Sequence, residues 1–192
     1  MIDTLQAWDE ALLMLLNGSP ESFSAAGWWL SQPWSSTPVY LFVIWRIFKG
    51  VTWQKGALRL VLVLLTFAGT DAISSRLFKP GFERLRPSHN PALEDTLILH
   101  ENADGTVYRG GRFGFVSSHA ANTFGLAGIA FLILGGSATL WLFVWAAAVS
   151  WTRMYLGVHY PADIVFGAVF GIGLAKATHT LFYRIFKAQL NA

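Results

Sequence analysis

Long apolar runs, among them residues 58–78 and 118–134, are the feature that most restricts the fold of this chain. Of its 192 residues, 54% are hydrophobic and only 13% are charged, whereas soluble domains usually carry about 25% charged residues. Inside a bilayer every backbone polar group needs a partner, and an α-helix supplies these partners within one segment. The sequence therefore predicts an all-α, polytopic bundle of membrane helices.

Polar breaks divide the chain into about five to six predicted transmembrane helices, all within one domain that covers residues 1–192. The pattern over residues 3–17 is amphipathic and acidic, and it is shorter than the roughly 20 residues that a crossing needs. We expect this helix to lie at the membrane interface. A short helix at residues 22–31 leads into the first crossing, and residues 79–117 are expected to form a long polar loop. The expected spans are residues 39–48, 58–78, 118–134, 139–155 and 161–186.

Basic residues indicate which loops are cytoplasmic, because cytoplasmic loops are enriched in Lys and Arg. The first 45 residues contain neither residue type. The basic residues that flank the first turn and end the chain are Arg46, Lys49, Lys55, Arg59, Arg184 and Lys187. The opposite side, which includes the loop at residues 79–117, carries a nearly equal number of basic residues. We assign it to the outer face by discounting Lys79, Arg86 and Arg153, which belong to the polar blocks described next.

Three short polar blocks interrupt the apolar runs, and alternating spans place all three at the same face of the membrane. Ionisable groups at a membrane boundary are costly unless they face one another or a ligand. The first block precedes Pro87, the second opens the span at 118–134, and the third joins the last two spans. Their ionisable and hydroxyl residues are Lys79, Arg86, Ser117, Ser118, His119, Arg153, His159 and Asp163.

These residue types suit phosphoryl transfer, in which a catalyst must neutralise phosphate charge, supply a nucleophile and protonate the leaving oxygen. Lys79, Arg86 and Arg153 can form a positive cradle, with Arg giving bidentate contacts to phosphate. Ser117 and Ser118 stand at a helix start, where a hydroxyl can cap the helix and free backbone N–H groups point at a bound anion. We expect all five to bind the substrate phosphate.

The two His residues and the Asp supply the reactive groups. His119 lies at the same helix start and is the expected nucleophile, whose attack on phosphorus would give a phosphohistidine. His159 is the expected general acid for the leaving group and then the general base for water. Asp163 follows His159 by four residues, so it can hold one imidazole nitrogen and direct the other at the substrate. No metal and no other cofactor is expected.

The composition of the chain limits which cofactors and binding partners it can have. Cys is absent, which excludes thiolate metal sites and disulfides. The net charge of +3 is small for a nucleic-acid-binding protein and suits anionic headgroups or substrates instead. The expected partners are therefore the bilayer and a lipid phosphate, with no nucleic acid, and the sequence gives no indication of an oligomeric state.

The three blocks resemble the motifs of the type 2 phosphatidic acid phosphatase (PAP2) superfamily, which also includes the vanadium haloperoxidases. The family pattern is Lys-x6-Arg-Pro, then Pro-Ser-Gly-His, then Ser-Arg-x5-His-x3-Asp. Residues 79–87 match the first motif fully. The other two motifs match with three departures: Val116 replaces Pro, Ser118 replaces Gly and Thr152 replaces Ser. The resemblance extends over residues 79–163.

The resemblance implies a metal-independent phosphatase with His119 as nucleophile and His159 as acid and base. It also implies a multi-pass protein of the bacterial inner membrane with its active site on the periplasmic face. Short bacterial members act on lipid phosphates; undecaprenyl diphosphate is the first expectation here, with phosphatidylglycerophosphate next and lipid A also in the class. Two alternatives stay open, a lipid phosphotransferase on the same scaffold and a non-enzymatic anion transporter.

Overall fold

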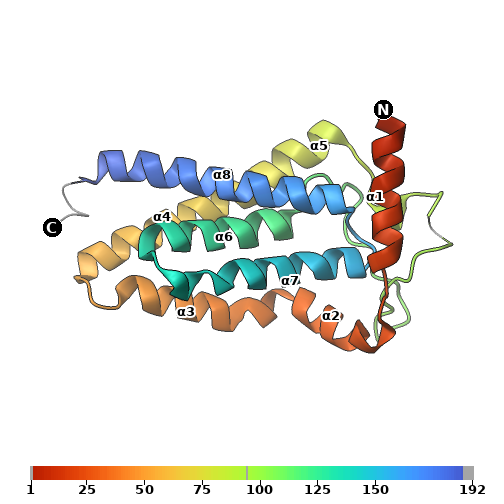
Figure 1. Ribbon diagram of the computed structural model, residues 1–192, viewed down its shortest axis with the longest axis horizontal. Helices are drawn as coiled ribbons and strands as arrows, with labels where there is room; N and C mark the ends of the chain where they lie inside the picture. The colour runs from red at the N-terminus through yellow and green to blue at the C-terminus, as the bar shows by residue number, and fades with distance from the viewer. Residues whose placement is uncertain (1, 94, 188–192) are drawn as a thin grey trace.

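The computed structural model describes residues 2–93 and 95–187, and the described chain is helical apart from its turns and one long loop (Figure 1). The all-α prediction is therefore confirmed. Short 3₁₀ turns join several of the helices. The helices are α1 (Ile2–Leu16), α2 (Ser24–Ser31), α3 (Thr37–Phe48), α4 (Trp53–Ile73), α5 (Lys79–Phe82), α6 (Ser118–Leu134), α7 (Trp141–Tyr155) and α8 (Pro161–Ile185).

Five helices form the bundle, and the N-terminal helix stands across one end of it. In Figure 1, α3, α4, α6, α7 and α8 run along the long axis, whereas α1 lies roughly perpendicular to them. The long loop between α5 and α6 gathers at the same end as α1. The position of α1 at the membrane interface stays a prediction.

An apolar core fills the space between the bundle helices, and apolar side chains also cover their outer surface. Val43, Leu62, Ile129, Leu142 and Phe182 come from five different helices and belong to one buried cluster. Large side chains of α4, α7 and α8 point outward, with 57% of Leu64, 71% of Val144 and 65% of Val169 exposed. A helix bundle that is apolar both inside and outside suits a lipid environment.

Two helices of the described chain are long and apolar enough to cross a bilayer by themselves. They are the continuous helix Trp53–Phe82, which contains α4 and α5, and α8 at Pro161–Ile185. Helix α6 is apolar but shorter. The membrane class of the fold is thus supported, while the number of crossings stays a prediction.

The expected start of the polar loop at residue 79 is wrong. The helix continues from α4 through a π-helical turn at Ser74–Phe78 into α5, so Lys79 lies on the helix. Pro80 falls within the first turn of α5, where a missing N–H is tolerated. The helix ends at Glu83, whose φ of 48° is left-handed. The same helix also begins earlier than expected, at Trp53 instead of residue 58.

Helices α6 and α8 are in backbone contact, and this contact sets the geometry of the end where both begin. A Cβ atom on Gly171 would collide with the backbone oxygen of Ala121. One on Gly167 would lie 2.8 Å from the backbone oxygen of Ser117. The Ser117 backbone N–H donates to the carbonyl oxygen of Asp163 at 3.0 Å. Glycine is therefore required for the N-terminal ends of the two helices to meet.

Helix α1 turns one acidic residue toward the protein. Its apolar residues Leu5, Trp8 and Leu15 are 67%, 70% and 73% exposed. Asp9, by contrast, is only 7% exposed and lies on the inner side together with the buried Leu13. The outward apolar face suits contact with the membrane interface, and the inward carboxylate reaches the end of the bundle.

Candidate active site

The three polar blocks meet at the end of the bundle where α6 and α8 begin. The Lys79 ammonium, at the end of the α4–α5 helix, donates to the Ser118 hydroxyl at 2.9 Å. His119 follows in the first turn of α6. The side chains whose charges act on its imidazole are Arg153, His159, Arg86 and Lys79. The structure therefore brings together residues that are up to 80 positions apart, as the motif spacing predicts.

His159 and Asp163 form a buried pair at the start of α8. The Nδ1 atom of His159 is 3.2 Å from Oδ2 of Asp163, and the two residues are 1% and 0% exposed. The same Asp163 oxygen accepts the backbone N–H of Tyr160, the N-cap residue of α8, at 3.1 Å. With Nδ1 held in this way, Nε2 is the nitrogen of His159 that remains for a substrate.

The surroundings of His159 keep it neutral in the unliganded protein. Burial lowers the pKa of His159 well below its ordinary value of 6.5, and the nearby charges of Arg86, Arg153 and Lys79 lower it further. A bound phosphate would oppose these cations and favour the protonated imidazole. The site therefore links protonation of His159 to the arrival of an anion.

Arg153 is the most enclosed member of the cationic cradle. It is 2% exposed, and its Nη2 donates to the hydroxyl of Tyr108 at 2.8 Å. Its Nε has no hydrogen-bond partner among the described residues. A buried donor without a partner costs about 1–3 kcal/mol, so an anion that accepts from Nε would recover this loss.

Arg86 is held between glycines of the long loop. Its Nε donates to the backbone oxygen of Phe113 at 3.2 Å. A Cβ atom on Gly110 would lie 2.5 Å from Nη1, and one on Gly114 would lie 3.2 Å from Cγ. Burial lowers the pKa of Arg86 to about 10, with the charge of Arg153 adding to the effect. Arg86 is therefore still cationic at neutral pH.

The two serines have different positions in the site. Ser117 is the N-cap of α6, and its hydroxyl accepts the backbone N–H of Ala120 at 3.4 Å. Ser118 accepts from Lys79 and also from the Ser74 hydroxyl, each at 2.9 Å. Both therefore hold the helix start or the cradle in place, and a hydroxyl that accepts can still donate to a phosphate oxygen. The N-terminal ends of α6 and α8 add favourable dipoles for an anion.

Arg84 is a site residue that the motifs do not single out. Its Nη1 donates to Oδ1 of Asp163 at 2.8 Å, and its Nη2 donates to Oδ2 of Asp9 at 2.6 Å and to Oε1 of Gln6 at 2.9 Å. Oδ1 of Asp9 in turn accepts the backbone N–H of Ala162 at 2.8 Å. This Asp9–Arg84–Asp163 bridge ties α1 to the carboxylate beside His159. Tyr108 is a second site residue outside the motifs, because its hydroxyl accepts a hydrogen bond from Nη2 of Arg153.

Sequence patterns contain little that could have located these contacts. Arg84 lies between Lys79 and Arg86 but outside the fixed positions of the motif, and Asp9 looks like any acidic residue of an amphipathic helix. Buried carboxylates on such helices are uncommon unless paired, yet burial is visible only in the structure. Within residues 2–93 and 95–187, no group of three or more His, Asp or Glu side chains is placed to hold a metal ion.

The arrangement combines cations, a helix start with a neighbouring imidazole, and an imidazole–carboxylate pair. Such a set can bind a tetrahedral oxyanion, attack its central atom and protonate a leaving oxygen.

Comparison with known proteins gives the same family as the motifs. Residues 39–187 match the model of the PAP2 superfamily. A lipid A 4'-phosphatase of Bacteroides thetaiotaomicron is 35% identical over 183 residues, which cover 89% of this chain and 75% of that protein. A lipid A 4'-phosphatase of Porphyromonas gingivalis is 37% identical over 134 residues, which cover 68% of this chain and 53% of that protein.

Solved structures share the fold. A transmembrane PAP2-type phosphatidylglycerolphosphate phosphatase from Bacillus subtilis superposes with a TM-score of 0.66 at 22% identity, covering 95% of this chain and 88% of that one. LpxE of Aquifex aeolicus superposes with a TM-score of 0.56 at 22% identity, covering 88% of this chain and 93% of that one. With the family model, the curated relatives and the fold in agreement, this chain belongs to the PAP2 superfamily.

Proposed function

We propose that the protein is an integral membrane phosphatase that hydrolyses a lipid phosphate, with its site at the periplasmic face of a bacterial inner membrane. The observation that carries the proposal is the convergence of three buried or half-buried cations on two imidazoles at one end of an apolar bundle. Curated relatives that are lipid A 4'-phosphatases, at 35% and 37% identity, support the same class of reaction.

The first step is attack on phosphorus. A ring nitrogen of His119 forms the N–P bond while the bond from phosphorus to the lipid oxygen breaks. Lys79, Arg86 and Arg153 stabilise the charge on the phosphoryl oxygens. His159, protonated as the anion binds, gives its Nε2 proton to the leaving oxygen, and Asp163 holds the resulting neutral ring.

The second step is hydrolysis of the phosphohistidine. Neutral His159 takes a proton from a water molecule, and the oxygen of that water forms a new bond to phosphorus. The N–P bond breaks, which returns the electron pair to His119 and releases inorganic phosphate. Both steps use the same cradle and the same acid–base pair, so no further group is needed to balance the reaction.

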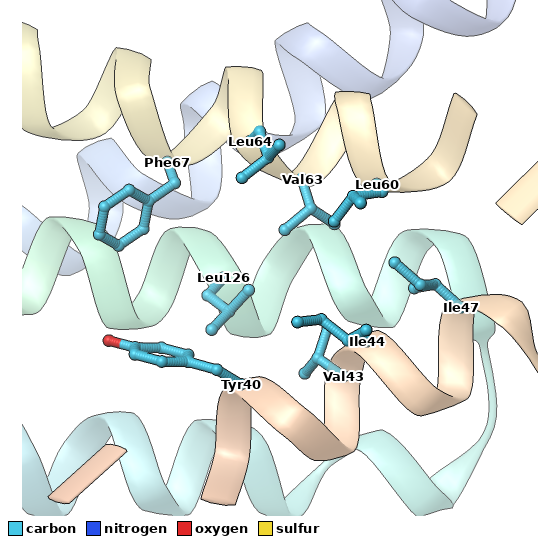
Figure 2. Close-up of a pocket in the computed structure, with 9 residues that line it drawn as sticks. All are labelled: Tyr40, Val43, Ile44, Ile47, Leu60, Val63, Leu64, Phe67 and Leu126. Carbon is cyan, nitrogen blue, oxygen red and sulfur yellow. The ribbon is translucent and has the colours of Figure 1, made fainter. Parts of the chain in front are cut away.

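The lipid tail has an apolar groove available to it (Figure 2). This groove, a cavity of about 210 Å³ between α3 and α4 with one contribution from α6, is lined by aliphatic and aromatic side chains. Ile44 and Leu64 on its rim are 43% and 57% exposed, so it is open at the side of the bundle. The residues that line the groove are Tyr40, Val43, Ile44, Ile47, Leu60, Val63, Leu64, Phe67 and Leu126.

A lipid A-type phosphate is the substrate that the relatives favour. Two curated proteins at more than one third identity carry this activity in their names. The sequence alone placed undecaprenyl diphosphate first and phosphatidylglycerophosphate second. We now place a phosphomonoester on an acylated sugar ahead of both.

Replacing His119 by Ala tests the proposal. Phosphate release from a lipid phosphate, assayed in detergent with EDTA present, should fall by a factor on the order of 10³ or more, since the nucleophile is lost. The wild type should keep its activity in EDTA. A matched control is His179→Ala, because His179 lies near the far end of α8, stacked on Tyr183. An active His119→Ala protein, or a wild type that EDTA inactivates, would contradict the mechanism.

A further inference from the structure

A second, partly polar pocket adjoins the nucleophile and continues toward the apolar groove. It is a cavity of about 220 Å³ between the α2–α3 segment and the pair α4 and α6. His119 and Asn122 line it from α6, and Asp71 lines it from α4. Tyr40 and Phe67 line both this pocket and the groove. In Figure 2 the Tyr40 hydroxyl points away from the apolar side chains of α3.

Asp71, an exposed residue, and Asn122, a partly buried one, form a hydrogen-bonded pair in the lining of this pocket. Asn122 Nδ2 donates to Oδ1 of Asp71 at 3.2 Å. The carboxylate fixes the orientation of the amide, since the flipped amide would set two oxygens against each other. Asn122 Oδ1 is then buried and has no partner within the described chain. An acceptor left in this way costs about 1–3 kcal/mol, and an acidic residue inside a membrane helix marks a functional position by default.

The chemistry of the pair limits what can bind there. Asn122 presents an oxygen, and Asp71 presents a carboxylate with a second acceptor oxygen. Ester carbonyls offer only acceptors and would leave both oxygens unpaired, and a second anionic group would be repelled by Asp71. A hydroxyl or an amide N–H, both neutral donors, satisfies the site. Asn122 lies three residues after His119 on the same helical face, so the donor belongs close to the scissile phosphate.

We propose that Asp71 and Asn122 form a specificity subsite that accepts hydrogen bonds from a hydroxyl or amide N–H carried beside the phosphate of the substrate. This assignment rests on the proposed lipid phosphatase function, and it specifies the class of headgroup that the substrate carries. A phosphorylated N-acyl amino sugar carries such donors on the ring that holds the phosphate. A diacylglycerol phosphate carries none there. The pair therefore selects sugar-borne phosphates over diacylglycerol phosphates.

A comparison of two substrates tests the subsite. One is a lipid with an N-acylated glucosamine 4-phosphate headgroup, and the other is phosphatidic acid with acyl chains of the same length. For Asn122→Leu and for the double variant Asp71→Leu with Asn122→Leu, the ratio of the two kcat/KM values should fall on the order of 10-fold. The double variant removes both polar partners together, a change that is nearly neutral for folding. It therefore decides the question if the single variant is unstable.

Asp95→Leu is the matched control, because Asp95 is an exposed carboxylate in the long loop. It should leave the ratio at the wild-type value. A ratio that stays at the wild-type value in both pocket variants overturns the subsite. If activity on both substrates falls equally at that constant ratio, the pair has a structural role instead. Failure of the proposed function looks different: wild type would release phosphate from neither lipid, or His119→Ala would retain activity.

Discussion

Replacing Arg84 by Met should slow catalysis while leaving substrate affinity nearly unchanged. Its guanidinium donors are directed at Asp163, Asp9 and Gln6, at 2.8, 2.6 and 2.9 Å. The guanidinium also lies over the Tyr160 ring, 4.1 Å from the centroid. We therefore expect Arg84 to act on the proposed reaction through Asp163, the carboxylate beside His159, as a positioning residue.

The magnitude follows from the bond that is lost. A hydrogen bond between charged groups contributes about 1.5–3 kcal/mol, and Asp163 is fully buried. If that amount is lost from alignment of His159 in the transition state, kcat falls by a factor of about 10 to 100. Stability should fall as well: removing one partner of a buried pair costs about 3–5 kcal/mol, and the 24% exposure of the Arg84 side chain places the loss at the low end of that range.

The assay is a determination of kcat and KM in detergent for Arg84→Met, Arg84→Lys and Asp9→Asn. Lysine keeps the charge but has no fork that reaches two carboxylates, so its kcat should be intermediate. Asp9→Asn keeps the contact between Arg84 and Asp163. It should therefore lower the thermal midpoint while leaving kcat near the wild-type value. An Arg84→Met protein with wild-type kcat, or a loss that falls entirely on KM, would refute the reasoning.

Two further predictions concern stability. Burial and nearby cations lower the pKa of His159 below 6.5 in the folded protein. The unfolded chain therefore binds the extra proton, and the stability of the fold falls as the pH drops below about 6.5. The difference between the thermal midpoints at about pH 5 and about pH 7.5 should be smaller in His159→Asn than in the wild type, and an equal difference would contradict the assignment. Gly171→Ala, which sets a Cβ against the backbone of Ala121, should destabilise the bundle by about 1–3 kcal/mol. Gly173→Ala meets nothing within 4 Å and should not lower the thermal midpoint; equal losses in the two variants would disprove the close contact.

The helix layout was largely predictable from the sequence, because apolar runs and terminating glycines or prolines are local signals. Helix α6 begins and ends at Ser118 and Leu134, where the polar block and Gly135 place it. The end of the α4–α5 helix was not predictable in the same way. Lys79-Pro80 looks like a break, whereas a π-helical turn carries the helix past it to Phe82.

For the site, contacts between residues close in sequence were predictable, whereas contacts between distant residues were not. The proximity of residues at fixed spacing within a motif, such as His159 and Asp163, could be predicted from the chain alone, and the two lie within hydrogen-bond distance. The Asp9–Arg84 ion pair joins residues 75 positions apart, and the Asp71–Asn122 contact joins residues 51 positions apart. Neither pair has a spacing that recurs in a motif, so only the packing of the helices brings them together.

The contact between α6 and α8 connects the fold to the chemistry. His119 is carried by the first turn of α6, and His159 and Asp163 stand at the entrance to α8, so the distance between the proposed nucleophile and the proposed acid depends on how closely these two helices cross. A larger side chain at Gly167 would push against Ser117, the residue that caps α6. It would separate the two imidazoles and turn both helix dipoles away from a common anion. In the proposed mechanism, the glycines of α8 are thus as much a condition for phosphoryl transfer as the cations of the cradle, although they contribute no side chain to the site.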